Sequence, residues 1–167
     1  MATSFARLLR GVVRTATRVR AANGRAPQRL LRVEPAGYPG DFTGVVRPVY
    51  APDLDGDPDP GEIVWTWVPY EEDRSRGTDR PVLVVGREGA WLLGLMLSTR
   101  DHDAAPARRD ETWLDLGRGD WDAEHRESEI RVDRVVRVDP AAVRREGAVL
   151  DRARFDLVAG SLAAARG

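Results

Sequence analysis

The sequence contains no cysteine and no lysine, and it has no long hydrophobic run. Without cysteine, the chain can form neither a disulfide framework nor a thiolate metal site. No apolar run approaches the roughly 20 residues that a membrane-spanning helix needs. At 167 residues, the chain is long enough for one domain with extensions. Such a domain can bury a hydrophobic core that needs no covalent cross-link.

Charge is distributed unevenly along the chain. Residues 1–33 hold eight arginines and no acidic residue, which gives a charge of +8. The other 134 residues hold 18 arginines and 27 acidic residues, which gives −9, and the two values add up to the formal net charge of −1. We therefore interpret the chain as a basic arm followed by an acidic body.

The basic arm, residues 1–33, has the pattern of an amphipathic helix over residues 4–22. Apolar residues recur there at helical spacing, and arginines occupy the opposite face. Such a helix is suited to an anionic membrane surface, to nucleic acid or to the acidic body. A transit peptide and a loosely ordered extension are the alternatives. We do not favour membrane association, but the sequence leaves these interpretations open.

The next segment, residues 34–58, is rich in proline, glycine and aspartate. This composition predicts a linker or interrupted extended structure, with a short strand at residues 43–49. The acidic run DLDGD at residues 53–57 resembles the start of a calcium-binding loop. Such a loop needs glycine where this chain has Pro58, and a bidentate glutamate where it has Val64. We therefore interpret the run as an acidic turn.

Residues 59–167 carry the pattern of a small β domain. Trp65 and Trp67 alternate with polar and smaller residues, so they share one face of a strand. Trp121 lies in a polar loop instead, where its ring is a candidate for stacking on bases. Short apolar runs bounded by turn residues predict the strands, at residues 61–68, 81–85, 91–97, 113–116 and 130–138.

Two helices are expected after the last strand. Asp139, followed by a proline, is a typical N-cap, and we expect that short helix to end at Gly147. Asp151 is the expected N-cap of a second helix. One side of this helix is apolar, formed by Phe155, Val158, Leu162 and Ala163. A run of strands closed by a helix favours a small barrel over a parallel sheet.

Three segments in order resemble the MazF/PemK family of toxin endoribonucleases: GEIVWTWVPYEEDRSRGTDRPVLVV at residues 61–85, LLGLMLST at 92–99 and SEIRVDRVVRVD at 128–139. The resemblance covers roughly residues 59–165. It implies a mainly β, SH3-like barrel with a C-terminal helix. It also implies cleavage of single-stranded RNA without metal or cofactor, a homodimer in the cytoplasm, and inhibition by a cognate antitoxin.

The resemblance also implies roles for individual residues. Arg80, before a proline, matches the arginine that binds phosphate and stabilises the transition state. Ser98 matches a hydroxyl residue at the end of a core strand, and Thr99 is the alternative because a one-residue slip exchanges the two faces of a strand. Arg131 and Asp133 match an acid/base pair, with Asp133 as base and Arg131 as acid or phosphate clamp. Because they are two positions apart, they project from the same face of a strand.

The chain departs from the family pattern in the loop before Arg80. Members usually carry a Glu-Gln pair there, whereas this chain has Glu71, Glu72 and Asp73, with no glutamine or histidine in the loop. The charge of the body is also acidic, although RNA binding favours a basic surface. The alternative function is therefore a non-catalytic barrel that binds nucleic acid or a protein partner.

Overall fold

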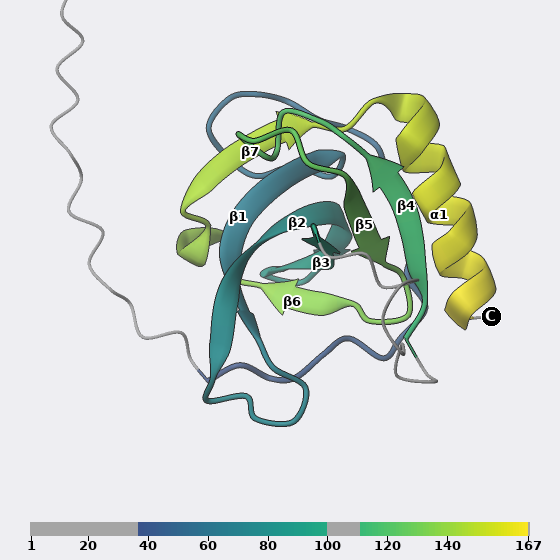
Figure 1. The fold of residues 1–167 in the computed structure, drawn as a ribbon. Coiled ribbons are helices and arrows are strands. Elements are labelled where there is room, and N and C mark those ends of the chain that lie inside the picture. Colours follow the sequence, from purple (N-terminus) through teal and green to yellow (C-terminus); the bar gives the residue numbers. More distant parts are fainter. Residues whose placement is uncertain (1–36, 100–110, 167) are drawn as a thin grey trace, which may run out of the picture. The chain divides into compact units, whose positions relative to one another are not determined.

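The computed structural model describes residues 37–99 and 111–166 (Figure 1). The chain divides into two units, Met1–Arg32 and Val33–Gly167, and the described residues all belong to the second. The helix expected at residues 4–22 lies outside the described residues. Within the described ranges, no helix is both long enough and apolar enough to cross a membrane.

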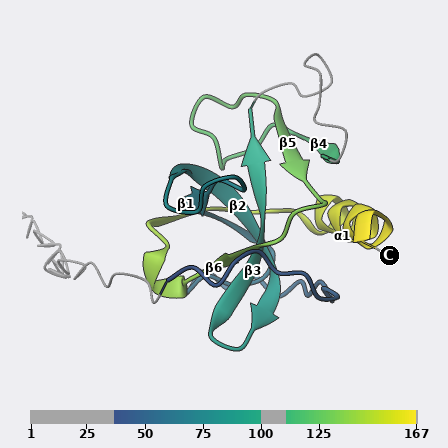
Figure 2. The same cartoon turned by 90° about the horizontal axis from the view of Figure 1, so that it is seen from below.

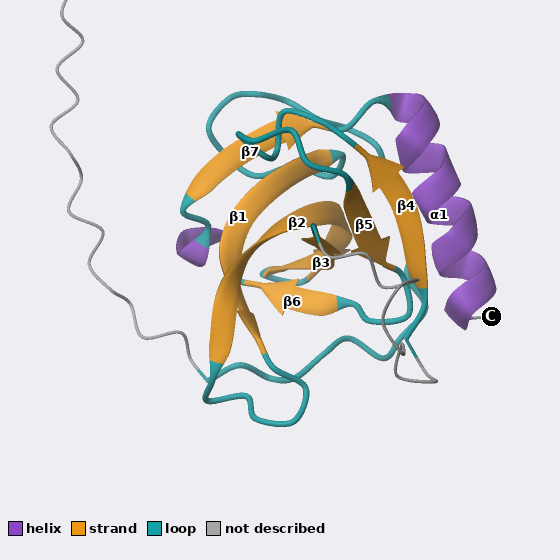
Figure 3. Cartoon of the chain, viewed as in Figure 1, coloured by secondary structure: helices purple, strands orange, loops and turns teal. Residues whose placement is uncertain are grey.

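The second unit is built on one antiparallel sheet that curls into a half-barrel (Figure 3). Its strands are β1 (Glu62–Pro69), β2 (Gly77–Glu88), β3 (Trp91–Ser98), β4 (Trp113–Gly117), β5 (Ser128–Arg131), β6 (Val136–Val138) and β7 (Arg145–Val149). Their order across the sheet is β4-β5-β3-β2-β1-β7, and β6 also pairs with β3. Within residues 37–99 and 111–166, one α-helix forms, α1 (Arg152–Arg166), after the last strand. The predicted mainly β fold with a C-terminal helix is confirmed.

Strands β1, β2 and β3 form the centre of the sheet and are apolar on both faces. One face contributes Ile63 and Leu83 to a core cluster that also contains Phe155 of helix α1. The opposite face contributes Val64 and Val82 to a second cluster. Both faces are covered, which explains why these strands read as nearly continuous apolar runs. Figure 2 shows α1 beside β4 and β5, at the side of the sheet away from β1 and β2.

The β2 strand is longer than the sequence pattern indicated. It begins at Gly77, inside the expected polar loop, because residues 77–80 pair with β1 through their backbones. The side chains in this part of the strand are polar, so the apolar pattern of the sequence did not predict it. The turn into β3 falls at residues 89–90, where Gly89 has a φ of 57°, a left-handed conformation that favours glycine.

The single strand expected at residues 130–138 is wrong. The structure has two short strands there, and both pair with β3: Ile130 of β5 lies opposite Leu97, and Arg137 of β6 lies opposite Leu93. Residues 132–135 interrupt the ladder between them. The apolar alternation continues through this interruption because Val132 and Val135 are buried without being in a strand.

The short helix expected from Asp139 to Gly147 is also wrong in its extent. Asp139 does cap a helical turn, since its Oδ1 accepts a hydrogen bond from the backbone N–H of Ala141 at 2.9 Å. The turn is a 3-10 helix of three residues, Pro140–Ala142. Strand β7 follows it and pairs with the edge of β1, so the tertiary ladder overrides local helix propensity.

The second expected helix is confirmed as α1. The Oδ1 of Asp151 accepts a hydrogen bond from the backbone N–H of Arg154 at 3.0 Å, which is N-cap geometry. Phe155, Val158 and Leu162 are buried against the sheet as expected. Ala163 is exposed, contrary to expectation.

Residues 37–58 run along the barrel and are hydrogen-bonded to it. The backbone N–H of Phe42 donates to Val135 O at 2.8 Å, and that of Val49 donates to Val85 O at 3.0 Å. The Tyr50 hydroxyl donates to Leu150 O at 2.8 Å. No strand forms at residues 43–49, contrary to expectation, and Phe42 makes only an isolated bridge. A proline at position 48 lacks the N–H that a continuous ladder needs.

Candidate functional site

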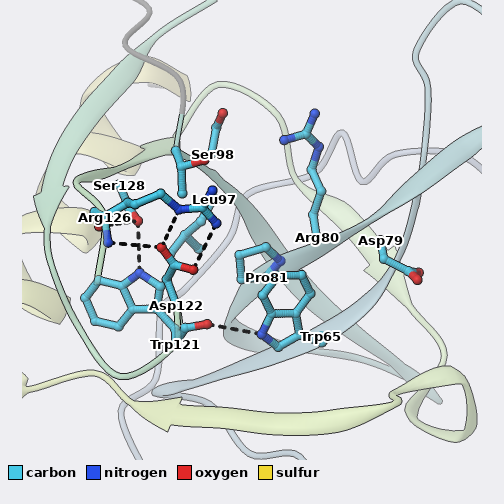
Figure 4. A pocket seen from close by; sticks show the side chains of 11 residues that line it. Trp65, Asp79, Arg80, Pro81, Leu97, Ser98, Trp121, Asp122, Arg126 and Ser128 are labelled. Carbon is cyan, nitrogen blue, oxygen red and sulfur yellow. Dashed lines mark hydrogen bonds and ion pairs between the residues drawn. The ribbon is translucent and has the colours of Figure 1, made fainter. Parts of the chain in front are cut away.

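An open pocket of about 150 Å³ lies between strands β1, β2 and β3 and the loop that joins β4 to β5 (Figure 4). Its floor is partly apolar and its walls carry both cations and carboxylates. The lining residues are Trp65, Asp79, Arg80, Pro81, Leu97, Ser98, Thr99, Trp121, Asp122, Arg126 and Ser128. These residues come from four separate stretches of the chain, so only the folded sheet brings them together.

Arg80 borders this pocket from β2. Its backbone lies opposite Thr66 of β1, and the side chain is half-buried. Figure 4 shows the guanidinium of Arg80 extended over the pocket, away from the carboxylate of Asp79. That carboxylate instead binds Nη1 of Arg144 at 2.5 Å. A guanidinium so placed matches the geometry of phosphate oxygens and stays charged at every working pH.

Ser98 borders the same pocket from the end of β3. The residue is buried and lies opposite Glu129 of β5. The structure therefore places Arg80 and Ser98 on the border of one pocket. Thr99 also lines the pocket, so both hydroxyl residues border it.

Arg126 and Asp122 form an ion pair at the pocket wall that the sequence analysis did not single out. Nε of Arg126 donates to Oδ2 of Asp122 at 2.8 Å, and Nη2 donates to Oδ1 at 3.0 Å, a two-point contact. The hydrogen bond from the Arg126 side chain holds the pKa of Asp122 well below its ordinary value. The only signal in the sequence is the i,i+4 spacing of the two residues. Because the loop has no strand or helix periodicity, that spacing alone does not indicate a contact.

Two tryptophans support the pocket from below. The indole N–H of Trp121 donates to Ser128 Oγ at 3.1 Å, and that of Trp65 donates to Trp121 O at 3.2 Å. Trp121 is only 3 % exposed, so its ring is part of the core. The expectation that it could stack on bases is therefore wrong, although its loop position suggested exposure.

Arg131 and Asp133 lie outside the residues that line the pocket. They contact each other, since Nη2 of Arg131 donates to Oδ2 of Asp133 at 2.8 Å. Nη1 of Arg131 also donates to Glu71 Oε2 at 2.6 Å and to Glu111 Oε1 at 3.3 Å. One guanidinium thus contacts three carboxylates, and we call these four residues the Arg131 cluster.

Burial and pairing act in opposite directions on Arg131. Its side chain is 5 % exposed, and burial by itself lowers the pKa of a guanidinium. The hydrogen bonds to Asp133 and Glu71 outweigh this effect and raise the pKa above its ordinary value. Arg131 is therefore fully charged and held in place by its partners. Among the described residues, no group of three or more His, Cys, Asp or Glu side chains is arranged to hold a metal ion.

The family model for PemK-like, MazF-like toxins of type II toxin–antitoxin systems matches residues 59–165, well over half of the chain. The chain belongs to this family. The match spans β1 to α1 and includes every residue that lines the pocket and the whole Arg131 cluster. Members of the PemK/MazF family are generally endoribonucleases of toxin–antitoxin systems.

Comparison with solved structures found a similar toxin chain. The Mycobacterium tuberculosis toxin MazF-mt6 matches with 16% sequence identity and a TM-score of 0.41. The match covers 62% of this chain and 94% of that chain. A comparison with curated proteins found no significant match.

Proposed function

We propose that this PemK/MazF family member is an endoribonuclease that cleaves single-stranded RNA at the pocket formed by Arg80 and Ser98. The observation that carries the proposal is that two residues from different strands, matched to the family pattern by sequence alone, border one open pocket. The cleavage needs no metal, because the RNA supplies its own nucleophile.

The reaction is a transfer at phosphorus. The 2′-oxygen attacks the adjacent phosphorus as its proton leaves, and the bond from phosphorus to the 5′-oxygen breaks. The products are a 2′,3′-cyclic phosphate and a 5′-hydroxyl, which takes up a proton. Negative charge on the phosphorane oxygens is greatest in the transition state, and groups fixed in place before the reaction stabilise it. Arg80 supplies this positive charge, and the hydroxyl of Ser98 positions the phosphate.

The roles that the resemblance gives to Arg131 and Asp133 stay a prediction. Their contacts favour a structural role, since Arg131 contacts three carboxylates and is buried. The carboxylate of Asp133 also accepts the backbone N–H of Thr112 at 2.7 Å. The cluster thereby joins the start of β4 to the end of β5.

The test is incubation of the purified full chain with single-stranded RNA in EDTA, followed by analysis of the ends. We expect cyclic phosphates and 5′-hydroxyls from the wild type and no cleavage by Arg80→Ala. An all-DNA oligonucleotide, which lacks the 2′-hydroxyl, should stay intact. Arg87→Ala is the matched control, because Arg87 lies on the same strand and outside the pocket, paired with Asp59 at 3.0 Å.

Each alternative function has its own outcome. RNA binding without cleavage by the wild type would indicate a non-catalytic barrel. Equal cleavage by the wild type and Arg80→Ala would place the active site elsewhere. Cleavage that appears only when a divalent cation is added would contradict metal independence.

We also propose that the protein acts as a cytoplasmic homodimer, with RNA bound across the subunit interface, and that a cognate antitoxin inhibits it. An acidic, initially disordered antitoxin segment is suited to occupy the pocket, since Arg80 and Arg126 both border it. The mass of the purified chain by light scattering tests the dimer. A competition assay with a polyglutamate-rich peptide tests whether the antitoxin and RNA bind the same pocket. The peptide should compete with RNA for the wild type but not for Arg80→Ala.

A further inference from the structure

A second arginine, Arg126, borders the pocket opposite Arg80. Its partner Asp122 fixes the direction of the Arg126 side chain. Figure 4 shows the guanidinium of Arg126 lying between Asp122 and Ser98, while Arg80 extends over the pocket from the other side. All four residues line this one pocket. The two cations therefore border the pocket from separate elements, strand β2 and the loop between β4 and β5.

The carboxylate of Asp122 is rigidly placed. Its side chain is 8 % exposed, and its Oδ2 accepts the backbone N–H of Arg126 at 3.0 Å in addition to the side-chain contact. Because two parallel hydrogen bonds hold the guanidinium, Arg126 loses little conformational freedom when it binds a ligand. A cation that is fixed in advance binds an anion more tightly than a freely rotating one.

The remaining nitrogen of Arg126 has a weaker partner. Nη1 lies 3.3 Å from Oε2 of Glu124, whose side chain is 72 % exposed. An exposed ion pair of this kind contributes little, because water screens it and the long side chain loses freedom. The side chain of Arg126 itself is 51 % exposed. A ligand oxygen can therefore replace Glu124 at Nη1 without disturbing the contact to Asp122.

We propose that Arg126 is a phosphate-binding residue for the RNA backbone, that Asp122 is its positioning residue, and that Glu124 competes with the phosphate for Nη1. The proposal rests on the proposed RNA-binding function of this pocket. Arg126 reaches the phosphate from the Ser98 side of the pocket, and Arg80 borders the pocket from the other side. The loop between β4 and β5 thereby takes part in holding the RNA strand.

The test measures binding and cleavage separately. Binding is followed by fluorescence anisotropy with a single-stranded RNA oligonucleotide that is 2′-O-methylated throughout, because methylation blocks the nucleophile. The variants are Arg126→Gln, Asp122→Asn and Glu124→Gln. The control is Arg118→Gln, which removes one charge from the same loop outside the pocket, where Arg118 binds Glu127 at 2.8 Å.

The three variants should not all change the affinity for RNA in the same direction. Arg126→Gln should weaken binding about fivefold to tenfold and reduce the salt slope by about 0.7, the value for one phosphate contact on a single strand. Asp122→Asn should weaken binding less, since the charge of Arg126 remains but its direction is lost. Glu124→Gln should strengthen binding about twofold to threefold, because the competing carboxylate is gone. Arg118→Gln should change the affinity by less than Arg126→Gln.

Two results would overturn the proposal. One is equal binding by Arg126→Gln and Arg118→Gln, which would mean that only overall charge matters. The other is unchanged binding by Glu124→Gln, an exposed substitution that leaves the fold intact. Cleavage assays on unmodified RNA should show a raised KM and a nearly unchanged kcat for Arg126→Gln. If the wild type does not cleave RNA but the anisotropy pattern holds, cleavage fails as the function and the phosphate site stands.

Discussion

Arg131 and Asp133 are two residues apart in the chain and bind each other through two parallel contacts, Nε to Oδ1 at 3.2 Å and Nη2 to Oδ2 at 2.8 Å. The same guanidinium also holds Glu71, from the loop after β1, and Glu111, which lies just before β4. A pair to which the family resemblance gives acid and base roles is thus the centre of an ion cluster between three chain segments.

The first prediction concerns the role of this cluster. Arg131→Met should lower the free energy of unfolding by about 3 kcal/mol, because three carboxylates lose their shared cation at a buried position. Asp133→Asn should cost less, about 1 kcal/mol, since Glu71 and Glu111 still bind Arg131. Urea denaturation measures both values. If Asp133→Asn instead abolishes RNA cleavage while stability is unchanged, Asp133 is the base that the resemblance implies.

The second prediction separates the two hydroxyl residues of the pocket. Ser98→Ala should lower kcat/KM for RNA roughly tenfold to hundredfold, the effect of one lost hydrogen bond to a charged phosphate. Ser98→Thr should retain most of the activity, because it keeps the hydroxyl. Thr99→Ala is the matched test, since Thr99 is exposed and lines the same pocket. A larger loss for Thr99→Ala than for Ser98→Ala would assign the role to Thr99.

The third prediction is a pH dependence of stability from Asp122. Its pKa is lower in the folded protein than in the unfolded chain, so the contact to Arg126 stabilises the fold fully above about pH 4. Stability should fall as the pH drops below that value, because the unfolded chain takes up the proton first. The measurement is Tm as a function of pH, taken at intervals of about one pH unit from about pH 6 to about pH 3. Asp122→Asn should show a flatter curve in that range, and an identical curve would contradict the prediction.

The fourth prediction concerns close packing between β2 and β3. A Cβ added at Gly94 would lie 2.3 Å from Cγ1 of Val82, far inside contact distance. Gly94→Ala should therefore destabilise the protein by about 1–3 kcal/mol, and Val82→Ala in the same chain should recover part of that loss. Thermal unfolding measures both. Gly160→Ala is the control, since nothing lies within 4 Å of its Cβ position on α1, and it should be neutral or stabilising.

The sequence determined the order and type of most elements. The apolar runs of β1 and β3 and the N-cap at Asp151 are local signals, and each led to the element that the structure contains. The short family motifs also pointed to Arg80 and Ser98 as candidate site residues, because each lies at a definite place relative to a strand. Those features depend on residues that are neighbours in the chain.

Tertiary structure decided the rest. Strand β7 forms because the edge of β1 offers a ladder, although the sequence there favours a helix end. The Arg131 cluster needs Glu71 from 60 residues away, and the Arg126–Asp122 pair gains a place in the pocket only when its loop packs beside Ser98. Long-range pairing of this kind leaves no periodic pattern in the sequence. A charged residue in a loop has the same local sequence pattern whether it is solvated by water or paired with another side chain, so its partner cannot be predicted.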